Sequence, residues 1–147
     1  MRKKDELAID KIIDCAKREF AEKGFEGASM RVIAESAGYT TGMLYGRFAD
    51  KGELFREIVK TPAEKLYGYY TKVQNDFASS APEKQYTEMH EYVDEKVDGM
   101  LDIVYDNFEE FKLIICKSKG SEYERFVDRL IEVETENTVR FIDKLNA

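Results

Sequence analysis

Hydrophobic residues recur every three or four positions along almost the whole chain, which is the spacing of one face of an α-helix. In the first such segment this face holds Ile9, Ile12, Ile13, Ala16 and Phe20. Gly24 follows and can adopt the left-handed conformation that ends a helix. Polar and apolar residues never alternate, as they do in strands, over a useful length. The pattern therefore predicts an all-α protein of about seven helices.

Two short helices separated by a tight turn are predicted next. Ser29 is a good N-cap for the first of them. Gly38 permits the turn, and Thr40 can cap the second helix. The apolar positions of the pair are Met30, Ile33, Ala34, Ala37, Leu44 and Phe48. This spacing is that of a helix-turn-helix, whose second helix can enter the major groove of DNA.

The rest of the chain predicts longer helices. Asp50 and Glu53 form a capping box for a helix that we expect to kink or break at Pro62. Residues 78–82 read as a linker. The clearest apolar stripe of the chain follows, and it holds Tyr86, Met89, Val93, Val97, Met100, Leu101 and Val104. After a corner near residues 106–107, a helix is expected to stop at Gly120, and Ser121 with Glu124 is expected to cap the last one.

Charge divides the chain into two parts. The 147 residues carry a formal net charge of −7, which by itself argues against a nucleic-acid partner. However, residues 1–60 hold 12 Lys and Arg against 11 Asp and Glu, whereas residues 61–147 hold 11 against 19. A near-neutral first part can still present cations on one face, and the acidic remainder would be repelled by DNA. This division predicts a head that binds DNA and a body with another role.

Residues 9–59 resemble the DNA-binding domain of the TetR family. The resemblance lies in Phe-Ala-Glu-Lys-Gly-Phe at residues 20–25, in the run 29–38, in Gly-Met-Leu-Tyr-Gly-Arg-Phe at 42–48 and in Lys-Gly-Glu-Leu-Phe at 51–55. It implies a homeodomain-like helix-turn-helix domain over residues 1–50. It also implies a helical effector-binding and dimerisation domain over residues 51–147, which is expected to lack the last two helices usual in that family.

The resemblance also implies which residues touch DNA. Base edges would be met by Thr40, Thr41 and Met43, with Gly42 allowing close backbone approach and Arg31 reaching the groove edge from the preceding helix. Phosphates would be held by Tyr45, Arg47 and Lys51. For Met43 a place at the edge of the core is an equal alternative. The family often has His at position 47 and an aromatic residue at position 46, where this chain has Arg47 and Gly46.

These features predict a sequence-specific transcriptional regulator, a repressor released from double-stranded operator DNA by a small-molecule effector. The functional molecule is expected to be a homodimer, because one short recognition helix reads only one half-site. The alternative is a helical interaction protein that keeps the helix-turn-helix without binding DNA. Acidic groups near an aromatic-rich pocket would favour a cationic aromatic effector.

Other classes of function find little support in the sequence. No nucleophile with its base, paired catalytic carboxylates or phosphate-binding glycine loop can be assembled, so we expect no enzyme. Neither a metal nor another cofactor is expected, since His90 is the only histidine and the two cysteines are far apart. The N-terminus does not resemble a signal peptide, and no apolar run is long enough for a membrane span. The expected location is the cytoplasm.

Overall fold

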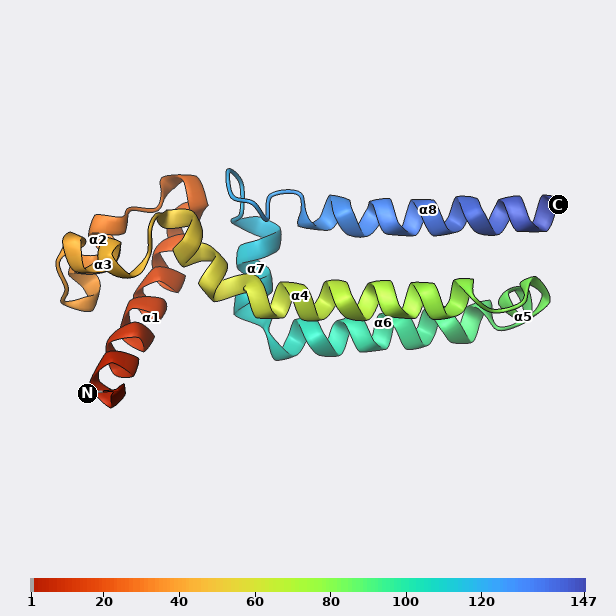
Figure 1. The fold of residues 1–147 in the computed structure, drawn as a ribbon, viewed down its shortest axis with the longest axis horizontal. Coiled ribbons are helices and arrows are strands. Elements are labelled where there is room, and N and C mark those ends of the chain that lie inside the picture. The colour runs from red at the N-terminus through yellow and green to blue at the C-terminus, as the bar shows by residue number, and fades with distance from the viewer. Residues whose placement is uncertain (1) are drawn as a thin grey trace. The chain divides into compact units, whose positions relative to one another are not determined.

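The computed structural model describes residues 2–147, apart from the side chain of Arg2, so Met1 of the expected first domain lies outside it. Within this range the chain is helical and contains no strand, which confirms the predicted all-α class (Figure 1). The helices are α1 (Arg2–Gly27), α2 (Met30–Ala37), α3 (Thr41–Arg47), α4 (Lys51–Ala78), α5 (Pro82–Thr87), α6 (Met89–Asp106), α7 (Phe108–Cys116) and α8 (Phe126–Asn146). None of the described helices is both long and apolar enough to cross a membrane.

The chain folds into two compact units whose limits differ from the expected boundary after residue 50. The first unit comprises the chain up to residue 61 together with residues 109–124, and the second comprises residues 62–108 and 125–147. The change from one unit to the other thus falls inside α4, between Thr61 and Pro62. The segment containing most of α7 returns to the first unit, where Lys17 pairs with Glu110 at 2.9 Å.

A kink or a break is expected at Pro62, and the break does not occur, because α4 is helical from Lys51 to Ala78 with this proline in its interior. A proline removes one backbone donor but has a φ angle compatible with a helix. Val59 and Ala63, on either side of it in the same helix, are both buried. Tertiary packing of the flanking turns therefore outweighs the lost hydrogen bond.

The first unit has a dense apolar core, which contains the predicted members except Ile9 and Ile13, which are half-buried. Phe20, Phe25 and Phe55 form a ring cluster in which Phe55 lies 5.0 Å and 5.3 Å from the other two ring centroids. Fully or almost fully buried around them are Ala16, Ile33, Ala34, Leu44, Leu54 and Val59. Gly24, with φ of 73°, interrupts α1 as expected, but one further turn continues to Gly27.

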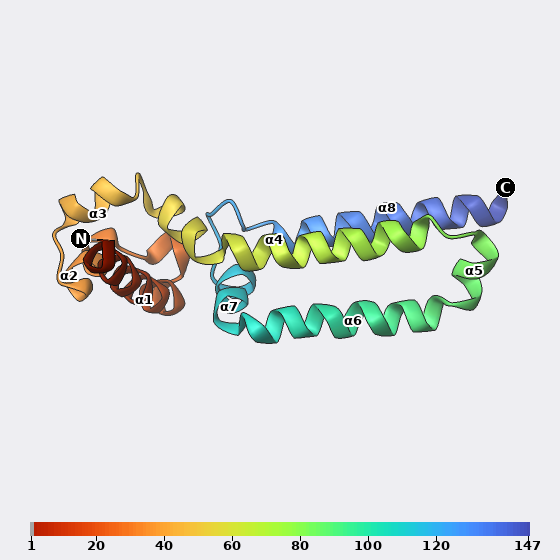
Figure 2. The ribbon, with the colours of Figure 1, turned by 60° about the horizontal axis from the view of Figure 1, so that its bottom comes forward.

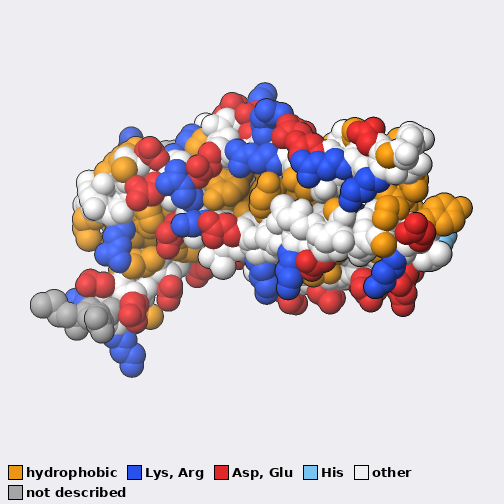
Figure 3. All heavy atoms as spheres, turned by 45° about the vertical axis from the view of Figure 1, so that its right-hand side comes forward, with side chains coloured by type: hydrophobic (Ala, Val, Ile, Leu, Met, Phe, Trp, Pro, Cys, Tyr) orange, Lys and Arg blue, Asp and Glu red, His pale blue; other side chains and the backbone are white. Residues whose placement is uncertain are grey.

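In the second unit side chains of the latter part of α4 bond to the two other long helices, Tyr69 to Glu95 O of α6 and Tyr70 to Glu134 of α8. The short helix α5 connects α4 to α6 (Figures 1 and 2). Its core is small and includes Leu66, Tyr70, Ile103 and Phe126. The apolar stripe predicted for α6, in contrast, is between 37% and 46% exposed at Met89, Val93, Val97 and Leu101. Its members Met100 and Val104 are half-buried. Figure 3 shows hydrophobic side chains exposed between charged ones on one face of the molecule. The stripe therefore predicts the helix but does not mark its packed face.

Two predicted helix boundaries in this part of the chain are wrong. The helix expected to run through Tyr86 is divided at Glu88 into α5 and α6, which raises the number of described helices from seven to eight. The last helix begins at Phe126, so Ser121 and Glu124 do not cap it. Instead Ser121 Oγ accepts a hydrogen bond from Tyr123 N at 3.1 Å within a turn. This turn is favoured because the Tyr123 ring packs on Phe55, 6.1 Å away.

Candidate nucleic-acid interface

Local capping positions α2 and α3, and all three predicted caps are confirmed. Ser29 Oγ accepts a hydrogen bond from Val32 N at 3.3 Å at the start of α2. Gly38 ends this helix in the left-handed conformation, with φ of 78°. Thr40 Oγ1 then accepts from Met43 N at 3.2 Å at the start of α3. The turn between the helices is therefore set by residues of the turn itself.

A buried carboxylate that the sequence analysis missed joins α1 to the start of α2. Glu19 Oε2 accepts a hydrogen bond from Ser29 N at 3.0 Å, and Lys23 pairs with Glu19 at 2.8 Å. Burial raises the pKa of Glu19, but the bonds from Lys23 and Ser29 outweigh burial and hold it below the ordinary value of 4.5. This contact between distant segments fixes the N-terminus of α2 on α1.

The two faces of α3 divide as predicted between core and solvent. Leu44 and Phe48 are buried in the first unit. On the other side, the side chains of Met43 and Tyr45 are 57% and 49% exposed, so the alternative that placed Met43 at the edge of the core is wrong. Also exposed are Thr40, Gly42, Gly46 and Arg47, while Thr41 is half-buried. One surface thus presents hydroxyl groups, a thioether, a phenol and a guanidinium.

The other two predicted basic contacts lie in different surroundings. Arg31, on α2, is exposed, and its Nε pairs with Glu35 at 2.9 Å one turn along the same helix. Lys51 is half-buried, and its ammonium donates to the carbonyl oxygens of Glu26 at 3.0 Å and Ala28 at 3.3 Å. The same ammonium lies 4.9 Å from the centroid of the Phe25 ring. Lys51 therefore ties the end of α1 to the start of α4 and does not share the exposed face of α3.

One cation near the turn was not predicted. The ammonium of Lys11, an exposed residue of α1, lies 3.8 Å from the position that a Cβ on Gly38 would occupy. Its position beside the turn between α2 and α3 depends on how α1 packs against α2. No local signal in the sequence distinguishes Lys11 from the other exposed lysines of α1.

A family model supports the helix-turn-helix assignment. Residues 12–58 match the model of bacterial regulatory proteins of the tetR family. The chain is therefore similar to the tetR family over this segment. The matched segment begins in α1, contains all of α2 and α3, and ends in α4 before Pro62.

Several curated proteins resemble the tetR-type segment or more of the chain. An uncharacterised HTH-type transcriptional regulator of Bacillus subtilis, YfiR, is 24% identical over 135 residues, which are 90% of this chain and 62% of the relative. The HTH-type transcriptional repressor KstR2 of Mycolicibacterium smegmatis is 33% identical over 51% of this chain and 36% of its own length. The regulator AcrR of Shigella flexneri is 45% identical over 32% of this chain and 22% of its own length.

The chain thus spans less than two thirds of the length of these relatives. No solved structure matched the chain. The residues expected to contact DNA lie in three different surroundings. Those on α3 are mostly exposed, and Arg31 is exposed but paired with Glu35. Lys51 bonds to the end of α1. The exposed group on α3 is therefore the strongest candidate for direct contact.

Proposed function

We propose that this protein is a transcriptional regulator that binds double-stranded operator DNA with the exposed face of α3 and represses transcription there. The observation that carries the proposal is that Met43, Tyr45 and Arg47 project from a short, well-capped helix of a tetR-family helix-turn-helix. Relatives named as repressors support the direction of regulation. The protein acts by binding and carries out no chemical reaction.

Sequence would be read by the N-terminal part of α3 and by Arg31. The Thr41 and Met43 side chains suit contact with a thymine methyl, and a guanidinium suits guanine. Arg31 would have to leave Glu35, but both partners are more than 60% exposed, so this ion pair is weak. Thr40 uses its hydroxyl oxygen as the cap acceptor and keeps its hydrogen for donation. Gly42 is exposed and has no side chain, which lets DNA approach the backbone.

Phosphates would be held by Tyr45 and Arg47 from α3 and by Lys11 from α1. A hydroxyl on a rigid arm and a charged fork are common phosphate partners, and such contacts set the register of the protein on the duplex. Lys51 would mainly hold the start of α4 in place beside α1, because its ammonium already donates to two carbonyl oxygens. It can offer at most one further N–H group to a phosphate. The second unit, with 8 Lys and Arg against 15 Asp and Glu, would be repelled by DNA.

The regulator would work as a homodimer in the cytoplasm, and a small-molecule effector would release it from the operator. One helix of seven residues contacts a single half-site, whereas a two-fold dimer reads two half-sites of a palindrome. A second copy can cover the exposed apolar face of α8, which holds Val127, Ile131, Val139, Ile142 and Leu145. Release would follow if the effector stabilised a dimer whose two heads do not match the operator spacing.

Replacement of Tyr45 and Arg47 by Ala tests the DNA contact. We expect the double variant to bind a selected operator duplex at least about tenfold more weakly, with a salt slope shallower by about one. A matched control replaces Tyr86 and Arg129, an exposed tyrosine and arginine of the second unit, and should bind like the wild type. Equal affinity of all three proteins would contradict the proposal and favour an interaction protein that does not bind DNA.

Replacement of Ile131 and Ile142 by Glu tests the dimer. Sedimentation at micromolar concentration should show a dimer for the wild type and a monomer for this variant. Because both side chains are about half exposed in the single chain, the variant should keep its helical circular dichroism. Val97→Glu, on the exposed face of α6, serves as the control and should remain dimeric. A wild-type protein that sediments only as a monomer would contradict this assignment.

A further inference from the structure

The second unit contains a pocket of about 470 Å³ between the end of α4, α5, α6 and α8. This volume lies in the range of small-molecule sites. Part of its wall is aromatic, because the rings of Phe77 and Tyr92 line it and stack on each other at 3.8 Å with an angle of 12° between their planes. Met89, Val93 and Phe141 add apolar surface. The pocket can therefore hold the apolar body of a ligand.

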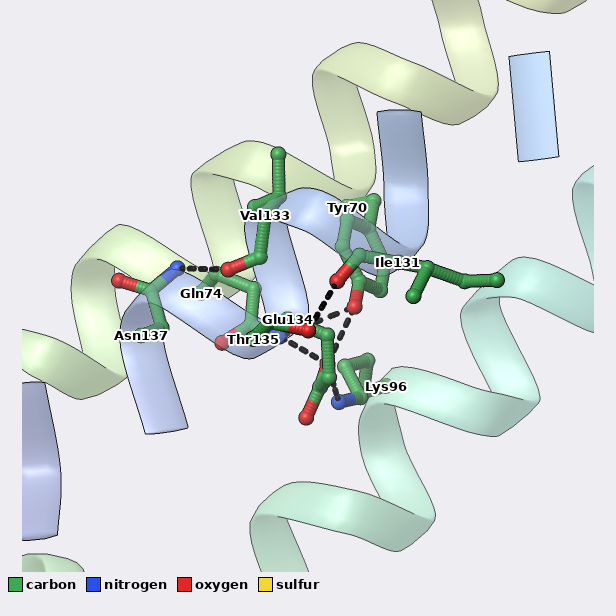
Figure 4. Close-up of polar contacts among 8 residues, drawn as sticks. All are labelled: Tyr70, Gln74, Lys96, Ile131, Val133, Glu134, Thr135 and Asn137. Carbon is green, nitrogen blue, oxygen red and sulfur yellow. Dashed lines mark hydrogen bonds and ion pairs between the residues drawn. The ribbon is translucent and has the colours of Figure 1, made fainter. Parts of the chain in front are cut away.

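At one side of the pocket a carboxylate is already neutralised. Lys96 Nζ pairs with Glu134 Oε2 at 3.0 Å, and Tyr70 and Gln74 donate hydrogen bonds to the same oxygen (Figure 4). Lys96 and Gln74 are buried, so these bonds form where water is scarce. Because Glu134 has a cation and two neutral donors, its negative charge is balanced before any ligand enters.

The remaining charges in the pocket wall are positive. Arg140 and Lys144 lie four residues apart on α8 and therefore project from the same side of the helix. Lys144 Nζ donates to the carbonyl oxygen of Ala78 at 2.9 Å, which does not neutralise its charge. The Arg140 side chain forms no hydrogen bond or ion pair with any residue of the described range 2–147. No carboxylate other than Glu134 lines the pocket.

This local excess of positive charge is opposite to the charge of the unit around it. The second unit has nearly twice as many acidic as basic residues, whereas three basic side chains and one acidic side chain line the pocket. The composition favours a cationic aromatic ligand, but the pocket wall does not. In addition, the Tyr92 hydroxyl is buried and has no hydrogen-bond partner within the described chain. A buried donor without a partner is unfavourable, and a ligand acceptor would satisfy it.

We propose that this pocket binds an organic anion, a carboxylate attached to an aromatic or aliphatic body. The carboxylate would lie between Arg140 and Lys144, and the apolar body would lie along the Phe77 and Tyr92 rings. Arg140 and Lys144 are exposed, so each contact alone is modest, but both can form charge-assisted hydrogen bonds with the same carboxylate. Binding of the carboxylate does not depend on the proposed function. Only the further step, that this carboxylate is the effector that releases DNA, rests on it.

Isothermal titration of the 147-residue chain with three probes of equal shape tests the chemistry. The probes are 2-naphthoate, 2-naphthylmethylamine and 2-naphthylmethanol, which carry a negative, a positive and no charge on the same ring system. We expect 2-naphthoate to bind at least about tenfold more tightly than the alcohol, the gain of one charge-assisted contact. The amine should bind more weakly than the alcohol. An amine that binds as tightly as the carboxylate would overturn the proposal.

Variants locate the binding. Arg140→Gln combined with Lys144→Gln should weaken 2-naphthoate binding at least about tenfold and leave the alcohol unchanged. The control Lys72→Gln with Arg129→Gln changes the net charge of the same unit equally, outside the pocket, and should bind like the wild type. Arg140→Gln alone guards against a variant that fails to fold. Its side chain has no hydrogen bond or ion pair within the described range whose loss could unfold the unit. Unchanged carboxylate affinity in both pocket variants would overturn the assignment.

The same titrations separate this inference from the proposed function, because they contain no DNA. Loss of operator binding in the α3 variants would leave carboxylate binding intact, and a chain that ignores carboxylates would still bind DNA. Addition of 2-naphthoate to the operator complex then tests the regulatory consequence. Release of DNA from the wild type but not from the Arg140→Gln and Lys144→Gln protein is expected. Release from both would show that the pocket does not mediate the effect.

Discussion

The first unit buries most of its apolar residues in a dense core, whereas the second unit has a small apolar core and exposes many of its own apolar residues. Around Phe55 in the first unit, three aromatic rings and several aliphatic side chains exclude solvent. In the second unit Lys96 is only 9% exposed, while Val97, its neighbour in α6, is 43% exposed. In the first unit the apolar face of a helix is its packed face, whereas in α6 of the second unit it is not.

This difference between the two units shows what an amphipathic pattern can and cannot predict. Amphipathic spacing shows that a helix has an apolar side, but the surface that covers this side can belong to another molecule. The packed side of α6 includes Tyr92, Lys96 and Ile103, which a pattern of apolar residues alone does not reveal. Exposed apolar stripes on α6 and α8 thus identify surfaces available for a partner. Substitutions at matched positions in the two units test this difference.

The largest expected effect is on stability, from Phe55→Ala. Removal of a fully buried aromatic side chain costs about 3–5 kcal/mol of unfolding free energy. Leu101→Ala, on the exposed stripe of α6, should cost less than about 1 kcal/mol in the monomer. Urea unfolding of both variants, followed by circular dichroism, measures the contrast. Equal costs would show that the α6 stripe is packed within the single chain.

A smaller effect is expected from Glu134→Gln. This change leaves Lys96 buried without its counter-ion and should cost about 1–3 kcal/mol at pH 7. The exposed Glu136→Gln, two positions along α8, is the matched control and should cost less than about 0.5 kcal/mol. Urea unfolding at pH 7 provides the measurement. Equal costs for the two changes would contradict a stabilising role for the Glu134 contacts.

The pH dependence of stability provides a second readout for Glu134. Burial raises the pKa of Glu134, but hydrogen bonds from Tyr70, Lys96 and Gln74 outweigh burial and hold it below 4.5. A lowered folded-state pKa means that the carboxylate stabilises the fold fully above the unfolded value and ceases to do so as the pH falls through the folded value. The difference in stability between wild type and Glu134→Gln should therefore shrink below pH 4.5. A difference that stays constant with pH would contradict this explanation.

The smallest effects are expected at two glycines, one in each unit. An added Cβ on Gly46 in α3 meets no atom within 4 Å, so Gly46→Ala should stabilise the protein by up to about 1 kcal/mol through helix propensity. An added Cβ on Gly99 in α6 would collide with the Tyr69 ring, whose hydroxyl binds Glu95 O at 3.0 Å. Gly99→Ala should therefore destabilise by about 1–2 kcal/mol. Melting temperatures that shift in opposite directions would confirm both expectations, and shifts of equal sign would contradict one.

Sequence reasoning was most successful where structure depends on neighbouring residues. The caps at Ser29 and Thr40 and the turn at Gly38 are local, and each was predicted correctly. The Ser121 box and the break at Pro62 failed because the Tyr123–Phe55 contact and the packing of α4 outweigh local preference. Local rules set a preference of about one kilocalorie per mole, which one buried contact can reverse.

Contacts between distant segments were not predictable in the same way. The role of Glu19 at the start of α2, and the engagement of Lys51 with the end of α1, depend on residues brought together by the fold. The same holds for the pocket, where the local charge is opposite to that of the unit. Periodicity and composition describe helices and averages, whereas these contacts depend on which helices become neighbours.

Selection of bound duplexes from a random pool shows whether α3 binds DNA in a sequence-specific way. If the N-terminal part of α3 reads the bases while Tyr45 and Arg47 hold the phosphates, wild-type protein should enrich a palindrome within a few rounds. The Tyr45→Ala and Arg47→Ala double variant should bind too weakly to enrich one. A pool that shows no enrichment with the wild type, or the same enrichment with the variant, would contradict the claim.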